Sequence, residues 1–424
     1  MLGCENTVIE GVDWHHDDTA GGQLAVTVHV RPLRRLAGRC GICGRKRPGY
    51  DQGEGRRRWR ALDLGPVTAW VEGDAPRVSC PQHGVVVAAV PWARHGAGHT
   101  RFFDDQVAWL AAACSKTTIT ALMRVSWRTV GNIIERVYAE KLAAADPLAG
   151  LTRIGIDEIS YKKGHKYLVI VVDHDSGRLV WAAPGRDKKT VRAFFDALGA
   201  ERTASLTHVS ADGAGWIAAV VTERAPAAVQ CTDPFHVVSW ATEALDEVRR
   251  EVWNHARSSP AGHAVRGGVR ARSIAAGDAR DLKRARYALW KNPGKLTARQ
   301  DAKLAWIQKT HPYLYRSWLL KEGIRVIFQL KGQPDAAAAA LDRWLKWAAR
   351  CRIPQFVALG KKIRRHRSGI AAAIEHQLSN GLIESMNTKI RVITRMAFGF
   401  HNPAALIALA MLALGGHRPA LPGR

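Results

Sequence analysis

The spacing of apolar residues divides the chain into sections with different expected structure. Up to about residue 98, short runs such as Leu24–Val30 and Val67–Glu72 alternate apolar with polar residues, which is typical of strands with one buried face. Arg101–Ala144 instead repeats apolar residues at helical spacing. From about 151 to 240 strand-like and helix-like runs alternate, and the pattern is then helical to Gly415. These changes of period predict a multidomain protein.

Three short helices are predicted between Arg101 and Tyr138. Their apolar positions are Phe103, Val107 and Leu110, then Ile119, Leu122 and Met123, then Val130, Ile133, Ile134 and Val137. Ser126 is suited to cap the third helix. The polar face of that helix carries Arg128, Thr129, Asn132 and Arg136, which can reach base edges and phosphates in the major groove. The segment therefore favours a helix-turn-helix, although an ordinary three-helix packing unit has the same spacing.

The alternating section predicts an α/β domain. Its strands are expected at Arg153–Ser160, Tyr167–Asp173, Leu179–Ala183, Thr207–Asp212 and Ala228–Thr232, with helices before and after the fourth strand. The order β-β-β-α-β-α-β is that of a ribonuclease H-like domain. In that order the first and fourth strands are neighbours, so we expect Asp157 and Asp212 to lie side by side.

The charge balance is strongly one-sided. Lys and Arg number 63 against 37 Asp and Glu, a net charge of +26, while the hydrophobic fraction of 47% is ordinary for a globular protein. Such a surplus attracts polyanions, nucleic acid first and an anionic membrane surface second. There is no run of 18 or more apolar residues, and Met1–Thr19 lacks a signal-peptide core. We therefore expect a cytoplasmic protein with double-stranded DNA as partner and no membrane contact.

Four metal ligands are predicted in the N-terminal section. The chain has seven cysteines, and Cys40-x-x-Cys43 is followed by Cys80-Pro-Gln-His83. Two such knuckles supply the closed tetrahedron that a structural zinc ion needs, which predicts a zinc ribbon. The run that carries Arg56, Arg57, Arg58 and Arg60 lies between the knuckles and suits contact with the DNA backbone.

The neighbouring carboxylates of Asp157 and Asp212 point to a divalent cation. Hard oxygen ligands suit Mg²⁺, and a third acid is expected from a later helix. Glu384 is the candidate, because Ile383, Met386, Ile390, Ile393 and Ala397 form the apolar face of its helix. The opposite stripe carries Glu384, Asn387, Thr388, Arg391 and Arg395, a metal ligand followed by groups suited to phosphates. A surface helix with a routine Glu–Arg pair is the alternative.

A long insertion separates the second acid from the third. Between Asp212 and Glu384 lie 171 residues, of which about 241–376 read as a helical insertion with 28 Lys and Arg against 11 Asp and Glu. Its Trp residues are mostly expected in the core. The basic residues Lys361, Lys362, Arg364, Arg365 and Arg367 are expected to bind phosphates.

Several motifs, in this order, resemble the ISL3 family of insertion-sequence transposases. They are Gly155-Ile-Asp157-Glu, Ser210-Ala-Asp212-Gly, Asp233-Pro-Phe-His236 and Asn380-Gly-Leu-Ile-Glu384-Ser-Met-Asn387, preceded by the zinc knuckles and the helix-turn-helix. The resemblance implies a catalytic DDE triad of Asp157, Asp212 and Glu384 in a ribonuclease H-like fold that uses Mg²⁺ or Mn²⁺. It also implies binding to the terminal inverted repeats of the element. Asp233 is a possible auxiliary ligand, and His236 either contacts DNA or packs.

The expected function is that of a DNA transposase, with strand cleavage followed by strand transfer. We expect an N-terminal segment with the zinc ribbon at 1–98, the helix-turn-helix at 99–146 and the catalytic domain at 150–415. A homo-oligomer assembled on DNA and a location at the bacterial nucleoid are further expectations. A non-catalytic DNA-binding regulator and a structure-specific nuclease are the alternatives, and the triad speaks against the first.

Overall fold

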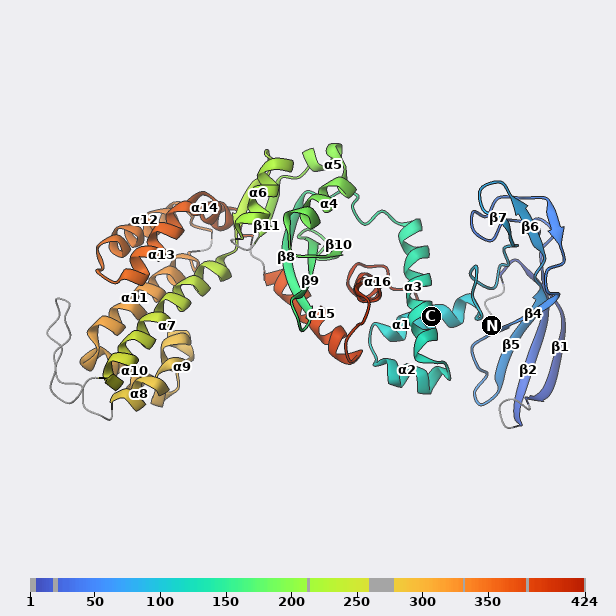
Figure 1. The fold of residues 1–424 in the computed structure, drawn as a ribbon, viewed down its shortest axis with the longest axis horizontal. Helices are drawn as coiled ribbons and strands as arrows, with labels where there is room; N and C mark the ends of the chain where they lie inside the picture. Colours follow the sequence, from blue (N-terminus) through green and yellow to red (C-terminus); the bar gives the residue numbers. More distant parts are fainter. Residues whose placement is uncertain are drawn as a thin grey trace.

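The computed structural model describes residues 5–17, 22–211, 214–258, 278–330, 332–378 and 381–422. A β-rich N-terminal region lies at one end of an elongated molecule, a five-stranded sheet lies in the middle, and a group of helices lies at the other end (Figure 1). None of the helices within these ranges is long and apolar enough to span a membrane. The N-terminal strands, the middle sheet and the far helices each have a hydrophobic cluster, in keeping with several domains.

Two small sheets form the N-terminal region. In the residues described there, the strands pair in the orders β1-β2-β5-β4 and β3-β6-β7. Their bounds are β1 (Thr7–Asp17), β2 (Gln23–Pro32), β3 (Gly49–Asp51), β4 (Arg56–Arg60), β5 (Thr68–Asp74), β6 (Arg77–Cys80) and β7 (Gly84–Val87). Val26 and Val28 of β2 and Val71 of β5 are buried with Trp59 and Trp92 in one hydrophobic cluster.

Three helices follow at the expected places: α1 (Arg101–Ala111), α2 (Lys116–Met123) and α3 (Trp127–Ala144). Ser126 caps α3 as predicted, because its hydroxyl accepts a hydrogen bond from the backbone N–H of Thr129. The expected apolar face of α2 is wrong at one position. Leu122 is 60% exposed, because this short helix packs through Ile119 and Met123 instead.

The described residues of the middle region form a sheet in the order β10-β9-β8-β11-β12. Its strands are β8 (Arg153–Lys162), β9 (Lys166–Asp173), β10 (Leu179–Pro184), β11 (His208–Ala211) and β12 (Val229–Thr232). The first three are antiparallel, and β11 and β12 run parallel to β8. The predicted adjacency of the first and fourth strands is therefore confirmed.

Helices cover both faces of this sheet. One face packs against α4 (Lys188–Leu198) and α6 (Gly215–Arg224), and the short α5 (Ala200–Ala204) packs against α4. The other face packs against α15 (Gly381–Met396) and α16 (Pro403–Leu414), and α16 in turn packs against α3. A single hydrophobic cluster joins Ile133 of α3, Ile170 of β9, Ile390 of α15 and Leu409 of α16. The helix-turn-helix segment therefore shares its core with the middle domain.

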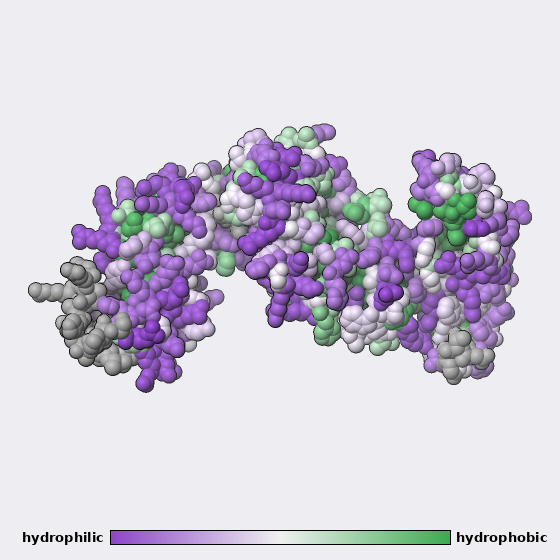
Figure 2. Space-filling view, in the orientation of Figure 1, coloured by the Kyte–Doolittle hydropathy of each residue, from purple (hydrophilic) through white to green (hydrophobic). Residues whose placement is uncertain are grey.

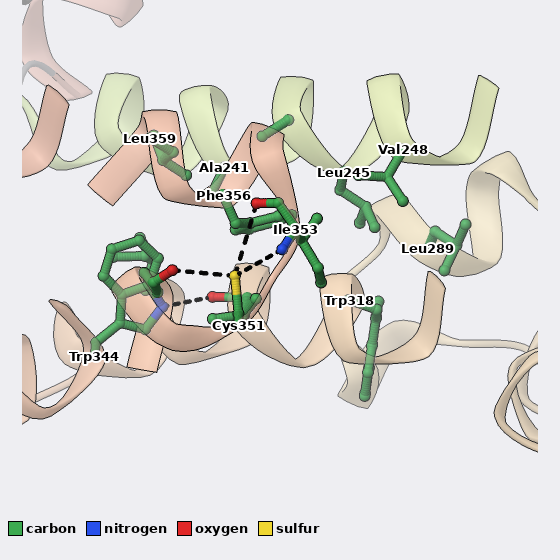
Figure 3. Close-up of a cluster of buried hydrophobic side chains, with 14 of the residues drawn as sticks. Ala241, Leu245, Val248, Leu289, Trp318, Trp344, Cys351, Ile353, Phe356 and Leu359 are labelled. Atoms are coloured by element: carbon green, nitrogen blue, oxygen red, sulfur yellow. Dashed lines mark hydrogen bonds between the residues drawn. The ribbon is translucent and has the colours of Figure 1, made fainter. Parts of the chain in front are cut away.

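The chain between β12 and α15 is helical in its described residues. It comprises α7 (Pro234–Ser258), α8 (Asp278–Arg284), α9 (Arg286–Trp290), the 3₁₀ helix η2 (Pro293–Lys295), α10 (Ala298–Thr310), α11 (Pro312–Ile327), α12 (Pro334–Arg350), α13 (Pro354–Arg365) and α14 (Arg367–Glu375). Leu245, Trp318, Phe356 and their neighbours form its own core (Figure 3). Buried Trp344 completes its hydrogen bonding by donating to the Leu320 carbonyl at 2.8 Å.

Candidate active site and metal centre

Asp157 lies in the middle of β8, on the sheet face that α15 covers. Its side chain is 7% exposed, and one oxygen accepts a hydrogen bond from the Glu158 backbone N–H at 2.8 Å. The other oxygen accepts from the Asn387 side-chain amide at 2.7 Å, although 230 positions separate the two residues. The amide thereby fixes the orientation of the carboxylate. Asn387 is 5% exposed and faces the sheet, whereas helical spacing had placed it on the polar stripe.

The close approach of α15 to β8 depends on Gly155. A Cβ atom at this position would lie 2.2 Å from Cδ1 of Ile383, so only glycine leaves room for the buried isoleucine. Ile383 is fully buried and begins the apolar face of α15, which continues through Met386 and Ile390 as predicted. Glu384, the next residue, lies in the first turn of the helix, one turn before Asn387.

Glu384 belongs to an acidic group that also contains Asp233. Burial raises the pKa of Glu384 above its usual value, and the Asp233 carboxylate raises it further, while His236 and Arg391 lower it. Two carboxylates within electrostatic reach of each other are the kind of pair that a divalent cation stabilises. Asp233, the possible auxiliary ligand, and its neighbour His236 thus lie within electrostatic reach of the proposed third acid.

Asp233 is held firmly at the end of β12. It is 1% exposed, and its backbone N–H donates to the Ala211 carbonyl at 3.2 Å. One carboxylate oxygen accepts from the Phe235 backbone N–H at 3.3 Å, and the other accepts from Nδ1 of His236 at 2.8 Å. These contacts tie the start of α7 to the ends of both parallel strands.

Asp212 lies outside the described residues, so its position stays a prediction from the sequence. The last residue of β11, Ala211, pairs with Ile156 in parallel register. Ala211 directly precedes Asp212 in the chain, and Ile156 directly precedes Asp157. Asp173, by contrast, is structural, because it accepts hydrogen bonds from the turn residues Asp175 and Ser176.

The two N-terminal knuckles come together as a metal site. Cys40, Cys43, Cys80 and His83 each offer a ligand atom, and these atoms all lie within 4.8 Å of one another. The Sγ atoms of Cys43 and Cys80 are 3.9 Å apart, and Nδ1 of His83 lies 3.6 Å from Sγ of Cys40. Tetrahedral zinc with Zn–S bonds of about 2.3 Å requires ligand separations of about 3.8 Å. The geometry therefore fits zinc.

Backbone groups prepare the Cys80 thiol of this site for a metal. Burial opposes ionisation of Cys80, but hydrogen bonds from the backbone N–H groups of Gln82 and His83, and from the His83 ring, lower its pKa to about 6. Gly41 permits the tight first knuckle, since a Cβ there would lie 2.5 Å from the Val87 carbonyl oxygen. Thiolates are the form that binds zinc, so these hydrogen bonds favour the liganding state of Cys80, whereas burial raises the pKa of Cys40.

Much of the arginine run on β4 is paired inside the N-terminal region. Arg56 donates to Glu72, Arg60 to Asp63, and Arg58 to the Thr27 hydroxyl at 2.7 Å. Arg57 donates to the Ala97 carbonyl at 2.9 Å. These contacts reduce the charge that the run offers to DNA, and its phosphate contact stays a prediction.

The four residues proposed for base reading on α3 differ in accessibility. Arg128 and Asn132 are exposed, and Thr129 is half-buried beside the capping Ser126. Arg136 forms an ion pair at 2.9 Å with Asp104 of α1, which is fully buried. Arg136 therefore holds α1 to α3 in this structure, while Arg128 and Asn132 face solvent.

The other basic residues proposed for phosphate contact are mostly accessible. Figure 2 shows a largely hydrophilic surface over the far helices. Of the proposed residues, those exposed there and on α15 are Lys361, Arg364, Arg365, Arg367, Arg391 and Arg395, although Arg367 is also ion-paired. Lys362 instead lies 3.7 Å from the ring centre of Trp240, and Arg367 pairs with Asp342 at 2.9 Å.

Comparison with known proteins adds three family models in the order of the regions above. Residues 37–83 match the zinc-finger of transposase IS204/IS1001/IS1096/IS1165, and residues 88–138 match the helix-turn-helix domain of transposase family ISL3. Residues 154–410 match the ISL3 model described as a transposase. The three matches together extend over most of the chain.

Whole proteins of similar sequence carry the same description. The transposase for insertion sequence element IS1557 of Mycobacterium tuberculosis is 60% identical over 430 residues, which cover all of this chain and 96% of the relative. The same figures hold for that protein in a second strain. The transposase for insertion sequence element IS1001 of Bordetella parapertussis is 24% identical over 69% of this chain and 70% of its own length.

Proposed function

The chain belongs to the ISL3 family of transposases, and we propose that it cuts and joins DNA at an acidic centre formed by Asp157, Asp212 and Glu384. It is a DNA-cleaving enzyme with a zinc ribbon and a DNA-binding helix-turn-helix. The observation that carries the assignment of residues is the hydrogen bond from Asn387 to Asp157. It joins α15, with Glu384 one turn earlier, to the strand of the first acid.

We assign the catalytic domain to the ribonuclease H-like fold. The support is the sheet order β10-β9-β8-β11-β12, with three antiparallel strands and then two parallel ones, and helices on both faces. As domain bounds we propose 1–98, 99–146 and 150–415, with a helical insertion at about 241–376. Because α3 and the sheet belong to one hydrophobic cluster, the boundary between 99–146 and 150–415 separates two proposed functions. It does not separate two parts that fold independently.

The oxygen-rich donor set fits Mg²⁺ or Mn²⁺, with Asp157, Asp212 and Glu384 as ligands and Asp233 as an auxiliary acid. When bound, such ions neutralise phosphate charge and polarise the attacking and leaving oxygens. Within the chain, Asn387 holds one oxygen of Asp157 in place, and His236 and the helix backbone hold Asp233. This fixed arrangement can position a scissile phosphate for in-line attack, first by water and then by the freed 3′-hydroxyl.

DNA recognition is assigned to the N-terminal regions. Arg128 and Asn132 on α3 are exposed and suited to base edges of the terminal inverted repeats. The zinc site gives the ribbon its rigidity, and the exposed cations of α13 and α15 suit the DNA backbone. Synapsis of two ends calls for a homo-oligomer assembled on DNA, and the substrate places the enzyme at the bacterial nucleoid.

The test is Mg²⁺-dependent nicking of a labelled inverted-repeat duplex. Glu384→Gln keeps size and hydrogen bonding while it removes the ligand charge, so nicking should fall by several orders of magnitude. Glu375→Gln changes an exposed acid on neighbouring α14 and should nick normally. Nicking by Glu384→Gln at the wild-type rate would refute the triad. End binding by wild type without nicking in Mg²⁺ or Mn²⁺ would favour a regulator.

A further inference from the structure

Phe235 is an exposed aromatic ring beside the acidic centre. The residue lies in the first turn of α7, directly after Pro234, and is 58% exposed. Among the phenylalanines in the described ranges, only Phe398 is also exposed. Burial of such a ring normally contributes to stability, so its position in solvent has no folding benefit. A single exposed apolar residue is ordinary by itself, and the argument therefore depends on its surroundings.

The backbone that carries this ring is fixed relative to the sheet. The Phe235 backbone N–H donates to the Asp233 carboxylate. The backbone N–H of Asp233 in turn donates to the Ala211 carbonyl at the end of β11. The His236 imidazole meets the Phe235 ring edge to face, with centroids 5.8 Å apart. Figure 1 shows α7 leaving the sheet region toward the far helices. The ring is thus presented at the rim of the site from a rigid support.

The charged residues around Phe235 indicate which kind of ligand binds beside its ring. Glu384 interacts electrostatically with both Asp233 and His236, the residues two before and one after Phe235. In the proposed function these acids, with their cations, receive a phosphodiester, and a nucleobase lies within a few ångströms of each backbone phosphate. A base offers a flat π-face, which stacks on aromatic side chains whatever its identity.

We propose that Phe235 is a binding platform for a nucleobase next to the cleaved phosphate. The inference rests on the proposed function and adds a base contact to a site otherwise built from carboxylates. Stacking would hold the nucleotide that leaves the duplex stack at the cut and so position its phosphate on the acids. Because the ring carries no charge, positioning of the nucleotide depends on stacking. It therefore requires both an aromatic side chain and a base.

The first test compares nicking rates of four variants on the labelled inverted-repeat duplex. Phe235→Ala and Phe235→Leu should nick about ten- to a hundredfold more slowly, the usual range for loss of one stacked base. Phe235→Tyr keeps the ring and should nick near the wild-type rate. Phe398→Ala removes the other exposed phenylalanine and should also nick normally. Equal rates for Phe235→Ala and wild type would overturn the proposal, as would full activity of Phe235→Leu, which would show that any apolar group suffices.

The second test removes the base instead of the ring. Abasic nucleotides are placed one at a time on either side of the cleaved bond. At the stacked position, wild type should slow to the rate of Phe235→Ala, and Phe235→Ala should slow no further. If the losses of rate from the abasic nucleotide and from Phe235→Ala added at every position, stacking would be refuted. Nicking by wild type would still support the catalytic assignment. A wild-type protein that bound the duplex but never nicked it would refute both.

Discussion

At the residue scale, the acidic centre depends on partners that orient its carboxylates. Asp157 is buried and charged, a condition that is costly unless hydrogen bonds compensate. Asn387 supplies one of these bonds from a helix that arrives much later in the chain. The amide therefore has two roles, since it docks α15 on the sheet and fixes the direction in which Asp157 presents its oxygens.

The first prediction separates these roles. Asn387→Ala should cut the nicking rate by at least about tenfold, because Asp157 loses its fixed orientation. It should also lower the free energy of unfolding by about 1.5–3 kcal/mol, the typical worth of a hydrogen bond to a charged group. Ser385→Ala changes an exposed residue of the same helix and should leave both unchanged. Nicking assays and urea unfolding measure the two effects, and unaltered nicking by Asn387→Ala would contradict the role given to the amide.

At the scale of elements, the small second sheet depends on its metal. Its hydrophobic cluster contains Cys40, Val78, Cys80 and Ala88, too few apolar groups to offset the entropy of ordering two knuckles. Zinc ligation supplies the missing free energy. The sheet is therefore expected to fold only with its ion.

The second prediction is that purified protein carries about one zinc ion per chain by elemental analysis. Cys40→Ser or His83→Ala should lose the ion and the ordered structure of the β3-β6-β7 sheet, measured by proteolysis within residues 37–83. Cys114→Ser, at a half-buried cysteine away from the knuckles, should keep both. Freshly purified, unchelated protein without zinc would contradict the assignment.

The third prediction concerns pH and the junction between the N-terminal region and α1. Burial lowers the pKa of His99 to about 4, and Arg136 and Arg60 lower it as well. The unfolded chain has a histidine pKa of about 6.5, so the neutral ring contributes stability above that pH. The contribution is lost as pH falls from about 6.5 to about 4. Urea unfolding at pH 7 and pH 5 should show a smaller loss for His99→Gln than for wild type; an equal loss would speak against a buried neutral ring.

How far the sequence predicts these elements depends on the kind of signal. Periodic apolar residues and a capping serine identified α3, and the strand order made β8 and β11 neighbours. The sequence did not predict which way side chains point at the margin of a helix face. Leu122 lies in solvent, Asn387 faces the sheet, and Arg136 pairs with buried Asp104. Tertiary partners decide such positions, and helical spacing alone does not contain them.

At the scale of the whole molecule, the helix proposed to read DNA and the helix proposed to support the cutting centre share one hydrophobic core. The apolar face of α3 packs against α16, and α16 and α15 pack on the sheet in the same cluster. A movement of the recognition helix on DNA therefore acts on a tightly packed interior that also supports Glu384.

The fourth prediction follows from this shared core. A chain without residues 1–145 should lose cooperative thermal unfolding, because α16 loses the apolar face of α3 against which it packs. A chain without residues 1–87 keeps those helices together with Arg94, which pairs with Glu140, and should unfold cooperatively. Calorimetry of both proteins checks the expectation, and cooperative unfolding of the shorter chain would show that the catalytic region folds alone.

The long separation between Asp157 and Asn387 also matters while the protein is being made. The ribosome completes β8 some 230 residues before it adds the amide that docks α15 there. The nascent enzyme must then wait for α16 before the core beneath α3 closes. An interrupted translation product thus has neither a finished recognition surface nor a finished cutting centre. We therefore expect only a chain synthesised through α15 and α16 to acquire the two together.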